Sequence, residues 1–487
     1  MKTLVCWLWC TLGIVLAAGM VSCDKKAGGG GGGAQLIIVS PHGSDIRREF
    51  AIAFENWHRE KYGSDVNLNW ADLGGGGTGN IVKALSANYA AGTSAGYDIM
   101  WGGGSRTFSD LNAQGFLQKP DLPAEVLAQV PADIHGSPLH GTGDNWIAAT
   151  MSNFGIAINK DRIAELGLKT PRYWEDIAGP DWYGRLSLGD PSKSGSVRTS
   201  YEMVLQQYGW EKGWRVLTQM FANAGVLRDT GSDPAYDVGS AEAIAGATID
   251  FFARKQIVRV GPRIAGFIVP EGGSTVDADP IAMFKGAPHA ELAAHFIQFV
   301  ISPAGQRLWV FRPGTPGGPV HSGLGRMTVL PELYEKESQY MTDPTNPFGA
   351  TEQLKPNPAD GAKFRTIFIG DLIKAAMVDN YQALMAARGA VKRAGDPPEL
   401  LARFGELPTF VPTKVQEGRL VDGPARVISA SPQDQQAVAD EYSPTSREKR
   451  AFLEHLQARL KERWRNEAAQ RYAEIQRAAE GGAGWGK

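Results

Sequence analysis

Cysteine is nearly absent from this 487-residue sequence, which contains three cysteines, all before residue 24. Cys6 and Cys10 fall within an apolar N-terminal run that we interpret as a cleavable export signal, so the mature chain would keep Cys23 alone. An exported protein could have formed disulfides, but a single remaining cysteine leaves no partner within the chain. A disulfide framework is therefore excluded.

The sequence also lacks an excess of charge of either sign. Its 50 Lys and Arg residues nearly balance 52 Asp and Glu residues, which gives a formal net charge of −2. This balance argues against nucleic acid or an acidic membrane surface as the main partner. The 43% hydrophobic and 21% charged residues are typical of a globular protein, and the length predicts two or three domains.

A long apolar run stands at the N-terminus, from Leu4 to Met20, and Met20-Val-Ser-Cys23 follows it. This pattern resembles a bacterial lipobox, so residues 1–22 are predicted to be a lipoprotein signal peptide and Cys23 the lipidated (palmitate-bearing) N-terminus. Residues 23–34 include six consecutive glycines and are predicted to be a flexible tether. A coincidental cysteine after an ordinary signal is the alternative.

Asp24 resembles the signal that keeps such lipoproteins on the inner membrane of enteric bacteria. We therefore expect a periplasmic protein that its lipid anchors to the inner (cytoplasmic) membrane, or to the extracellular face in a host with one membrane.

One local arrangement recurs along the chain: a short apolar strand, a turn rich in Gly and Ser, and the start of a helix. Residues 36–39 lead through Ser40-Pro-His-Gly-Ser44 into a helical pattern, and residues 185–188 lead through Ser192 to Ser196 into another. Free N–H groups and hydroxyls at such junctions favour an anionic or polar ligand. An ordinary turn with a Ser N-cap is the plain alternative for any one of them. The alternation of strands and helices indicates an α/β fold.

Two motifs match enzyme signatures and fail on context. Gly74 to Gly79 satisfies G-x-G-x-x-G, but the acid expected after the next strand is missing, because Asp98 precedes that strand. Gly92-Thr-Ser-Ala-Gly96 matches the nucleophile elbow, yet here the order is helix, Ser, strand instead of strand, Ser, helix. Neither a dinucleotide site nor a hydrolase is expected.

Several spaced motifs resemble the extracellular solute-binding proteins of ABC importers, nearest to the iron(III), phosphonate and sugar-phosphate group. They are Thr170-Pro-Arg-Tyr-Trp-Glu-Asp-Ile, Gly184-Arg-Leu-Ser-Leu-Gly-Asp-Pro-Ser-Lys-Ser-Gly-Ser, Val269-Pro-Glu-Gly-Gly-Ser, and the run from Lys285 to Gln306. The resemblance extends from about Gln35 to Gln306, and more loosely to about Gly395.

The resemblance implies a two-lobed α/β fold of the type II periplasmic-binding-protein class, with a hinge, an interlobe cleft and here a C-terminal helical extension. The first lobe would comprise residues 35–144 and 264–313, and the second residues 145–263 and 314–420. Residues 421–487 would form a linker and an amphipathic helix. Its apolar stripe predicts packing against the body, with a partner-binding helix as the alternative; the stripe contains Phe452, Leu456, Leu460, Trp464, Tyr472 and Ile475.

Ligands of this architecture lie at the carboxyl ends of strands that face the cleft. The candidate ligand-binding residues by that criterion are Ser40, His42, Gly43, Thr78, Gly79, Trp101, Gly102, Ser194, Gly195, Ser196, Ser232 and Ser240. Trp101 would either stack on a ligand ring or pack in the core.

Iron(III) needs anionic oxygen donors, and the tyrosine pair of the iron-binding members is missing from residues 260–267. His289 and His295, six apart, cannot share a helix face, and His58 and His455 are expected on the surface. No metal, cofactor or catalytic residue is predicted. The donors, with His42 and Arg198, favour a phosphate, phosphonate or carboxylate ligand.

Glu242 leaves a cationic ligand of the polyamine or thiamine type as an alternative, unless it serves a helix N-terminus. The expected function is that of a non-enzymatic, monomeric receptor whose closed form delivers its ligand to a membrane permease driven by a separate ATPase. The competing hypotheses are a lipoprotein that presents its ligand to a sensor kinase, and a periplasmic hydrolase.

Overall fold

The computed structural model describes residues 34–481, except 72, 74–77, 93, 350–353 and 355–360. The predicted signal peptide, Cys23 and nearly all of the glycine tether lie outside the described residues, as do Gly74 to Gly77. Among the described residues, no helix combines the length and the apolar character needed to span a membrane.

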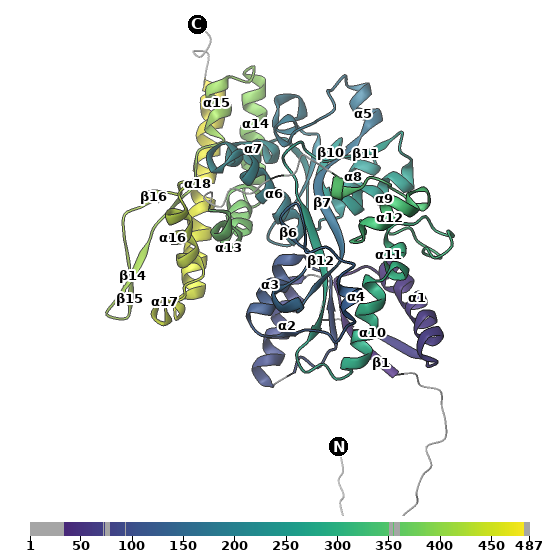
Figure 1. Ribbon diagram of the computed structural model, residues 1–487. Coiled ribbons are helices and arrows are strands. Elements are labelled where there is room, and N and C mark those ends of the chain that lie inside the picture. Colours follow the sequence, from purple (N-terminus) through teal and green to yellow (C-terminus); the bar gives the residue numbers. More distant parts are fainter. Residues whose placement is uncertain are drawn as a thin grey trace, which may run out of the picture.

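The first lobe begins with three parallel strands and the helices that connect them (Figure 1). Strand β1 pairs with both β2 and β3 and is therefore the central strand of the three. Its apolar residues Leu36, Ile38 and Val39 are fully buried, as expected of a central parallel strand. The elements are β1 (Ala34–Val39), α1 (Ser44–Tyr62), β2 (Val66–Ala71), α2 (Thr78–Ala91), β3 (Ile99–Trp101) and α3 (Ser105–Ala113).

Two long antiparallel strands join the lobes. Strand β7 (Ile147–Asn159) has 13 residues: its first half pairs with β12 (Val276–Phe284), and its second half pairs with β10 (Ala245–Ile249) and β11 (Ala265–Ile268). These strands belong to one sheet with the order β2-β1-β3-β12-β7-β10-β8-β9, which includes β8 (Leu186–Gly189) and β9 (Ala224–Arg228), while β11 pairs with β7 outside this order. The chain therefore crosses between the lobes within a continuous sheet.

The second lobe repeats the parallel arrangement, since β8 pairs in parallel with β9 and β10. Its elements are β8 (Leu186–Gly189), α6 (Gly195–Tyr208), α7 (Trp210–Ala222), β9 (Ala224–Arg228), α8 (Asp233–Gly239) and α9 (Asp250–Val260). Residues 245–249 form β10, which is fully buried between β7 and β8, and α9 begins directly after it at Asp250.

Ala282 and Met283 lie near the end of β12, and the next helix is α10 (Ala290–Ile301), followed by α11 (Pro303–Val310). Smaller elements complete the two lobes. They are β4 (Leu117–Gln118), α4 (Ala124–Leu127), β5 (Asp133–Ile134), β6 (Ser137–Pro138), η1 (Thr142–Asp144), α5 (Lys160–Glu165), η2 (Trp174–Ala178), η3 (Pro180–Trp182), α12 (Pro331–Glu337), η4 (Ser338–Tyr340) and η5 (Pro347–Gly349).

Two large hydrophobic clusters form the cores of the lobes, and β7 contributes to both. The first contains residues from Leu36 to Met151 and again from Val276 to Met341, and the second contains residues from Ile156 to Ala247 and from Phe368 to Ile475. The segment from Leu324 to Met341 thus packs with the first lobe, whereas the sequence-based division assigns residues 314–420 to the second.

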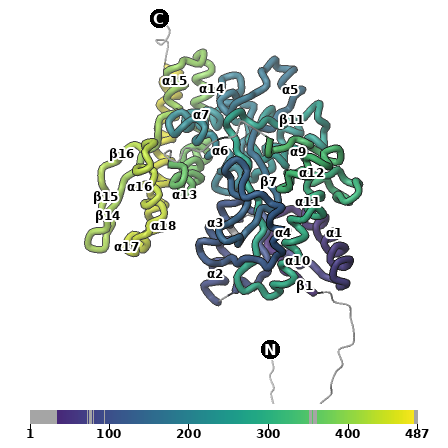
Figure 2. Tube along the Cα trace, viewed as in Figure 1, coloured from purple at the N-terminus to yellow at the C-terminus, as the bar shows by residue number. Residues whose placement is uncertain are grey.

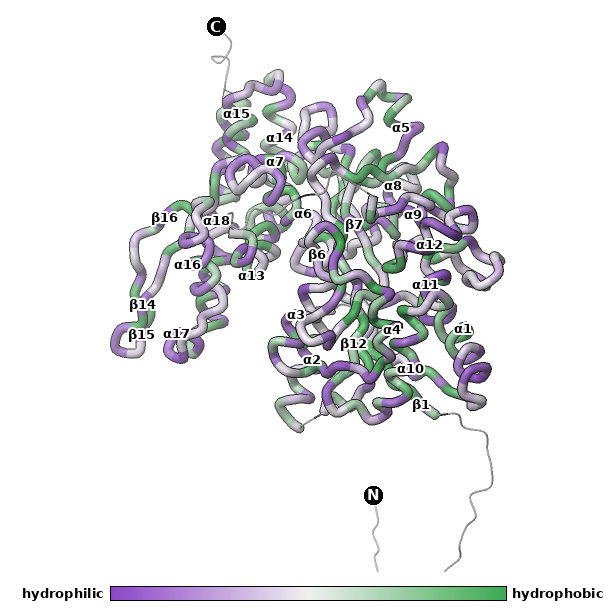
Figure 3. Tube along the Cα trace, viewed as in Figure 1, coloured by the Kyte–Doolittle hydropathy of each residue, from purple (hydrophilic) through white to green (hydrophobic). Residues whose placement is uncertain are grey.

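Residues 361–481 form a C-terminal appendage that packs on the second lobe (Figures 1 and 2). Its long helix α18 buries Leu456, Leu460 and Trp464 against the rest of the chain, so the apolar stripe packs against the body. Figure 3 shows mostly hydrophilic colours at α17 and at the tip of the β14–β15 hairpin, both far from that core. The elements are α13 (Ala362–Ile373), a π-helical turn (Lys374–Val378), α14 (Tyr381–Arg393), α15 (Pro398–Arg403), β13 (Thr409–Phe410), β14 (Thr413–Gln416), β15 (Arg419–Asp422), β16 (Arg426–Val427), α16 (Pro432–Tyr442), α17 (Arg447–Arg450) and α18 (Leu453–Gly481).

Candidate functional site

The sheet directions make the strand carboxyl ends of the two lobes face each other. Strand β3 runs antiparallel to β12, which runs antiparallel to β7, so β3 and β7 point the same way; β10 and its parallel neighbours point the opposite way. Ile281 of β12 pairs with Trp101, the last residue of β3, and also with Ile147 of β7, so the end of β3 lies level with Ile147. The last residue of β10, Ile249, pairs with Phe154 of β7. Seven residues of β7 separate these levels (154 − 147), about 23 Å of strand.

Most of the predicted residues of the first lobe gather at this edge. The His42 backbone N–H donates to Ser40 Oγ over 3.1 Å, and Gly43 is the N-cap of α1. A Cβ added to Gly102 would lie 2.7 Å from the His42 ring, and one added to Gly103 would lie 2.9 Å from the Thr78 methyl group. Gly79 follows Thr78 in the first turn of α2.

Trp101 lies behind this edge instead of on it. Its side chain is 0% exposed, and its ring contacts His42, Phe50 and Trp309 at centroid distances of 4.7, 4.7 and 5.6 Å. Core packing, one of the two roles that the sequence leaves open, is thus the one seen in this structure.

A buried charge network that sequence reasoning missed supports the same edge. Asp279 Oδ2 lies 2.7 Å from Arg326 Nη1 and 3.2 Å from His42 Nε2, while its Oδ1 accepts from the Gly103 N–H over 2.7 Å. Arg326 also donates to Ser152 Oγ on β7 over 2.9 Å. These contacts tie the turns after β1 and β3 to both crossing strands.

The network fixes the charge of its members. Burial by itself would raise the pKa of Asp279, but Arg326 and His42 outweigh it and hold this pKa far below its usual range. Burial lowers the pKa of His42 more than Asp279 raises it, so His42 is neutral at pH 7. The first lobe therefore presents a neutral imidazole beside a compensated ion pair.

Asp277 lies two residues before Asp279, on the same face of β12, and behaves differently. Burial raises its pKa to about 6, although Ser105 Oγ at the start of α3 donates to it over 2.5 Å. The polar and apolar alternation of Val276-Asp-Ala-Asp-Pro280 was a sequence signal for a strand with two carboxylates on one face. No local signal pointed to Arg326, which lies between α11 and α12.

The second lobe brings together Ser194, Gly195, Ser196 and Ser232. Ser194 Oγ and Ser196 Oγ are 3.1 Å apart, and a Cβ added to Gly231, next to Ser232, would lie 2.6 Å from Ser196 Oγ. Ser194 caps α6, a 14-residue helix. The first N–H groups of a helix have no acceptor within the helix, and the N–H groups of Gly195 and Ser196 donate to no acceptor among the described residues.

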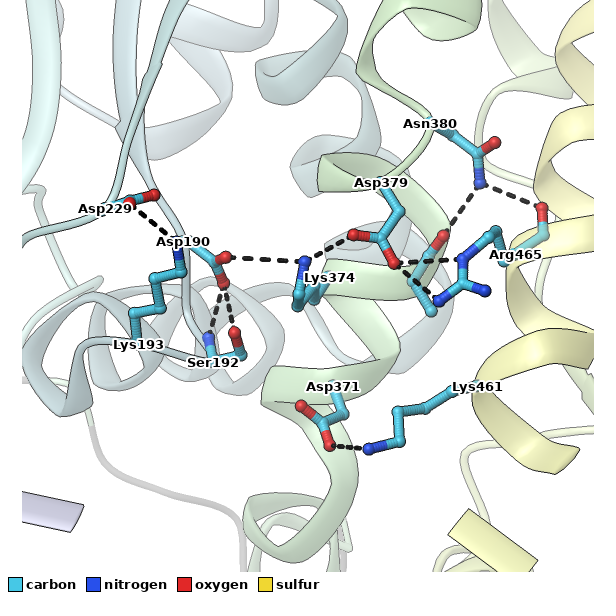
Figure 4. A network of polar contacts seen from close by, with 11 residues as sticks. Asp190, Ser192, Lys193, Asp229, Asp371, Lys374, Asp379, Asn380, Lys461 and Arg465 are labelled. Atoms are coloured by element: carbon cyan, nitrogen blue, oxygen red, sulfur yellow. Dashed lines mark hydrogen bonds and ion pairs between the residues drawn. The ribbon is translucent and has the colours of Figure 1, made fainter. Parts of the chain in front are cut away.

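The C-terminal appendage braces this turn, as Figure 4 shows. Asp190 accepts from the Ser192 N–H over 2.8 Å and from its hydroxyl over 2.7 Å, and Lys374 Nζ of the π-helical turn lies 3.8 Å from Asp190. Lys193 pairs with Asp229 over 2.7 Å, which links the turns after β8 and β9. The serine-bearing turn is therefore held from two sides.

Ser240 does not join this group. It lies at the C-terminal end of α8, where its hydroxyl donates to the Asp237 carbonyl over 3.1 Å, about 10 Å along the helix from Ser232. Glu242 neither begins a helix nor stands free, because it pairs with Arg228 over 2.9 Å.

Arg198 lies in the first turns of α6 and packs beside the appendage, since a Cβ added to Gly370 of α13 would lie 3.2 Å from its Cδ. Desolvation lowers the pKa of Arg198, whereas the charge of Asp371 on α13 raises it and that of Arg106 on α3 lowers it. Arg198 has no ion-pair partner in the described part of the chain.

The histidines form no metal centre in the described residues, where no group of three His, Cys, Asp or Glu side chains could hold an ion. The prediction that His58 lies on the surface is wrong, since it is buried and its Nε2 lies 3.2 Å from His295 Nδ1. His455 is exposed.

Two α/β lobes joined by crossing strands, with strand carboxyl ends facing each other, define the fold of the type II periplasmic binding proteins, extended here by C-terminal helices. The family model for bacterial extracellular solute-binding proteins matches residues 97–325 and confirms the resemblance seen in the sequence. Crystal structures agree with the fold. An apo ferric ion-binding protein A from Pasteurella haemolytica has a TM-score of 0.51 at 15% identity (76% of this chain, 98% of that one), and a substrate-binding protein of an ABC transporter from Agrobacterium tumefaciens has a TM-score of 0.50 at 18% identity (66% and 86%).

Characterised and uncharacterised relatives also match in sequence. The phosphoglycerate transport regulatory protein PgtC of Salmonella typhimurium is 32% identical over 162 residues, which are 33% of this chain and 40% of that protein. An uncharacterized protein of Haemophilus influenzae is 24% identical over 308 residues, 61% of this chain and 82% of its own length. The match to PgtC thus spans well under half of that relative.

Proposed function

We propose that this protein is the solute-binding component of an ABC importer, which captures a small anionic solute between its lobes and delivers it to a membrane permease. One observation carries the proposal: hydroxyl and N–H donors at the end of β8 face the His42 and Gly102 edge across the crossing strands. Donors that converge on one ligand from two bodies favour the closed form over the open form.

The donors of the second lobe suit an oxyanion. The start of α6 offers two N–H groups, two serine hydroxyls and Arg198, and a helix N-terminus adds about 0.3–1 kcal/mol toward an anion. PgtC is named for phosphoglycerate, which carries a phosphate and a carboxylate. A small phosphorylated acid is therefore the first ligand class that we propose.

The first lobe would recognise the uncharged part of the ligand. Asp279 is compensated by Arg326 and His42 is neutral, so neither presents a free charge to an anion. Asp277, with a pKa of about 6, can accept a hydrogen bond from a ligand hydroxyl at neutral pH. The ion pair of Glu242 with Arg228 argues against the amine ligand that this carboxylate suggested.

The location, the membrane anchor and the partners of the protein are part of the same proposal. We expect a monomeric, non-enzymatic receptor, anchored through a lipid on Cys23 in the periplasm and served by a permease and an ATPase. A second candidate, a regulator that presents its ligand to a sensor kinase, is favoured by the printed name of PgtC and by the appendage that braces the Ser192 turn. Neighbouring genes for a permease and ATPase, or for a kinase, would separate the two.

Calorimetry and small-angle scattering test the ligand and the closure together. The panel of ligands is 3-phosphoglycerate, a phosphonate, a dicarboxylate and a polyamine. We expect the protein to become more compact when it binds one of the three anions. A nearly complete shift from open to closed requires a differential affinity of about 5.5 kcal/mol. Ser196→Glu should weaken anion binding at least tenfold, because it places a carboxylate at the start of α6.

Ser240→Glu is the matched control, since it adds the same charge at the far end of α8 and should leave binding unchanged. Binding without compaction for every ligand of the panel would contradict the receptor proposal. Recovery of a chemically altered ligand would favour the hydrolase.

A further inference from the structure

A pocket lies between α7 of the second lobe and α14 and α15 of the appendage, away from the facing strand ends. Figure 1 shows α7 beside α14. The volume of the pocket is about 500 Å³, within the range of small-molecule sites. Residues of the second lobe form one wall and residues of the appendage form the other. The lining residues are Glu175, Ala178, Gly179, Pro180, Lys212, Arg215, Val216, Gln219, Arg388 and Leu401.

Positive charge predominates in this lining. The lining contains three basic residues, Lys212, Arg215 and Arg388, and one acidic residue, Glu175. Lys212 Nζ pairs with Glu175 Oε2 over 2.6 Å, which compensates one cation. Arg215 is exposed and has no ion-pair partner among the described residues, so the pocket keeps uncompensated positive charge.

Arg388 supplies the observation that points to a ligand. Its side chain is 3% exposed, and Nη1 pairs with Asp396. Nη2 is buried and has no hydrogen-bond partner among the described residues. A buried guanidinium N–H without an acceptor is unfavourable, and a planar donor fork of this kind matches carboxylate and phosphate oxygens.

We propose that this pocket is a second binding site, which takes a small oxyanion such as a phosphate ester or a carboxylate. Nη2 of Arg388 donates to the anion from the appendage, and Arg215 balances its charge from α7. Val216 and Leu401 contact the apolar part of the ligand. This site shares no residue with the site at the facing strand ends and holds independently of the ligand proposed there.

An occupant of this pocket would join the appendage to the second lobe. In the structure, Gln219 Nε2 donates to the Leu401 carbonyl over 3.4 Å, a long contact across the same seam. A ligand held by Arg388 and Arg215 together would add bonds across the seam. The position of the appendage would then depend on the concentration of a solute.

Phosphate binding to the full mature chain with the Ser196→Glu substitution tests the proposal, since that change blocks the donor site at α6. Inorganic phosphate is the probe, with chloride at matched ionic strength. We expect saturable binding by calorimetry and slower hydrogen exchange in residues 381–403. At about 10 mM phosphate, a site with a Kd of about 1 mM would be nine-tenths filled.

Adding Arg388→Gln to this protein should reduce phosphate binding at least tenfold. Arg215→Gln should have the same effect, and because Arg215 is exposed, this variant should fold even if Arg388→Gln does not. Arg393→Gln is the matched control, because this arginine is also on α14 but does not line the pocket. Absence of phosphate binding in the Ser196→Glu protein would overturn the proposal. Binding that survives Arg215→Gln, or exchange protection elsewhere than residues 381–403, would overturn it as well.

Discussion

Asp277 and Asp279 are two residues apart on one strand face, yet their pKa values move in opposite directions. Both are desolvated, which raises the pKa of a carboxyl group. Asp279 has Arg326 at 2.7 Å, and this cation more than reverses the effect of burial. Asp277 has a hydroxyl partner and the negative charge of Asp279 nearby, so its pKa rises to about 6. A cation contributed by a distant loop thus decides the charge of Asp279, and Asp277 has no such cation beside it.

This contrast gives a pH-dependent prediction for Asp277→Asn. Because the folded-state pKa of Asp277 is raised, ionisation costs stability as pH rises from about 4 to about 6, and the cost persists above that range. The variant should be more stable than the wild type at pH 8 by about 1–3 kcal/mol and equally stable near pH 4. Urea unfolding at both pH values measures the difference.

Asp121→Asn, an exposed position, controls for the removal of one negative charge. A gain from Asp277→Asn that is the same at pH 4 and pH 8 would show that burial does not raise the pKa of Asp277.

At the scale of elements, the periodicity of apolar residues is a dependable guide where a helix packs on one side only. The stripe on α18 is such a case, and Leu456, Leu460 and Trp464 are buried as their spacing predicts. The same criterion cannot identify β10, where every residue is buried. A fully buried strand has no polar side, so its pattern cannot be distinguished from that of a buried helix segment.

Trp464→Ala tests the packing of α18. The indole is 1% exposed, its Nε1 donates to the Thr409 carbonyl over 2.9 Å, and its ring stacks on Tyr442. Truncation should cost about 3–5 kcal/mol of stability through the cavity it leaves, as measured by chemical unfolding. The exposed Glu462→Ala on the same helix should cost almost nothing. If Trp464→Ala lowers the free energy of unfolding by less than about 1 kcal/mol, the alternative that α18 binds a partner would be favoured.

At the scale of the whole molecule, side chains beside the crossing strands also hold the lobes together. Lys255 on α9 of the second lobe pairs with Asp45 in the first turn of α1, and Arg254 pairs with Asp343 over 3.0 Å. Both members of the Asp45–Lys255 pair are only about a quarter exposed, 26% and 28%. Such a pair is screened less by solvent than a surface pair is. It therefore biases the lobes toward the arrangement in this structure.

Lys255→Met should loosen that arrangement. We expect a larger radius of gyration for the ligand-free variant by small-angle scattering, because Asp45 loses its cation. A double-mutant cycle with Asp45→Asn should give a coupling free energy of about 1 kcal/mol. Lys336→Met removes a cation from a pair within α12 and should leave the radius unchanged. An unchanged radius for Lys255→Met would show that the crossing strands alone hold the lobes.

The sequence by itself determined what depends on near neighbours in the chain. The α/β class, the serine-rich turn before α6 and the buried stripe of α18 follow from turn chemistry and periodicity, which act over a few residues. Spaced motifs carried the resemblance to solute-binding proteins. For these features, local preference and global fold agree.

Only the tertiary structure decided which distant groups meet. Asp279 and His42 are 237 residues apart in the sequence, and the pocket of Arg388 and Arg215 exists only because α14 packs near α7. The burial of Trp101 and the location of Ser240 away from Ser232 also depend on how whole elements pack. Such contacts follow from strand order and helix docking over long separations, and no local pattern of residues encodes them.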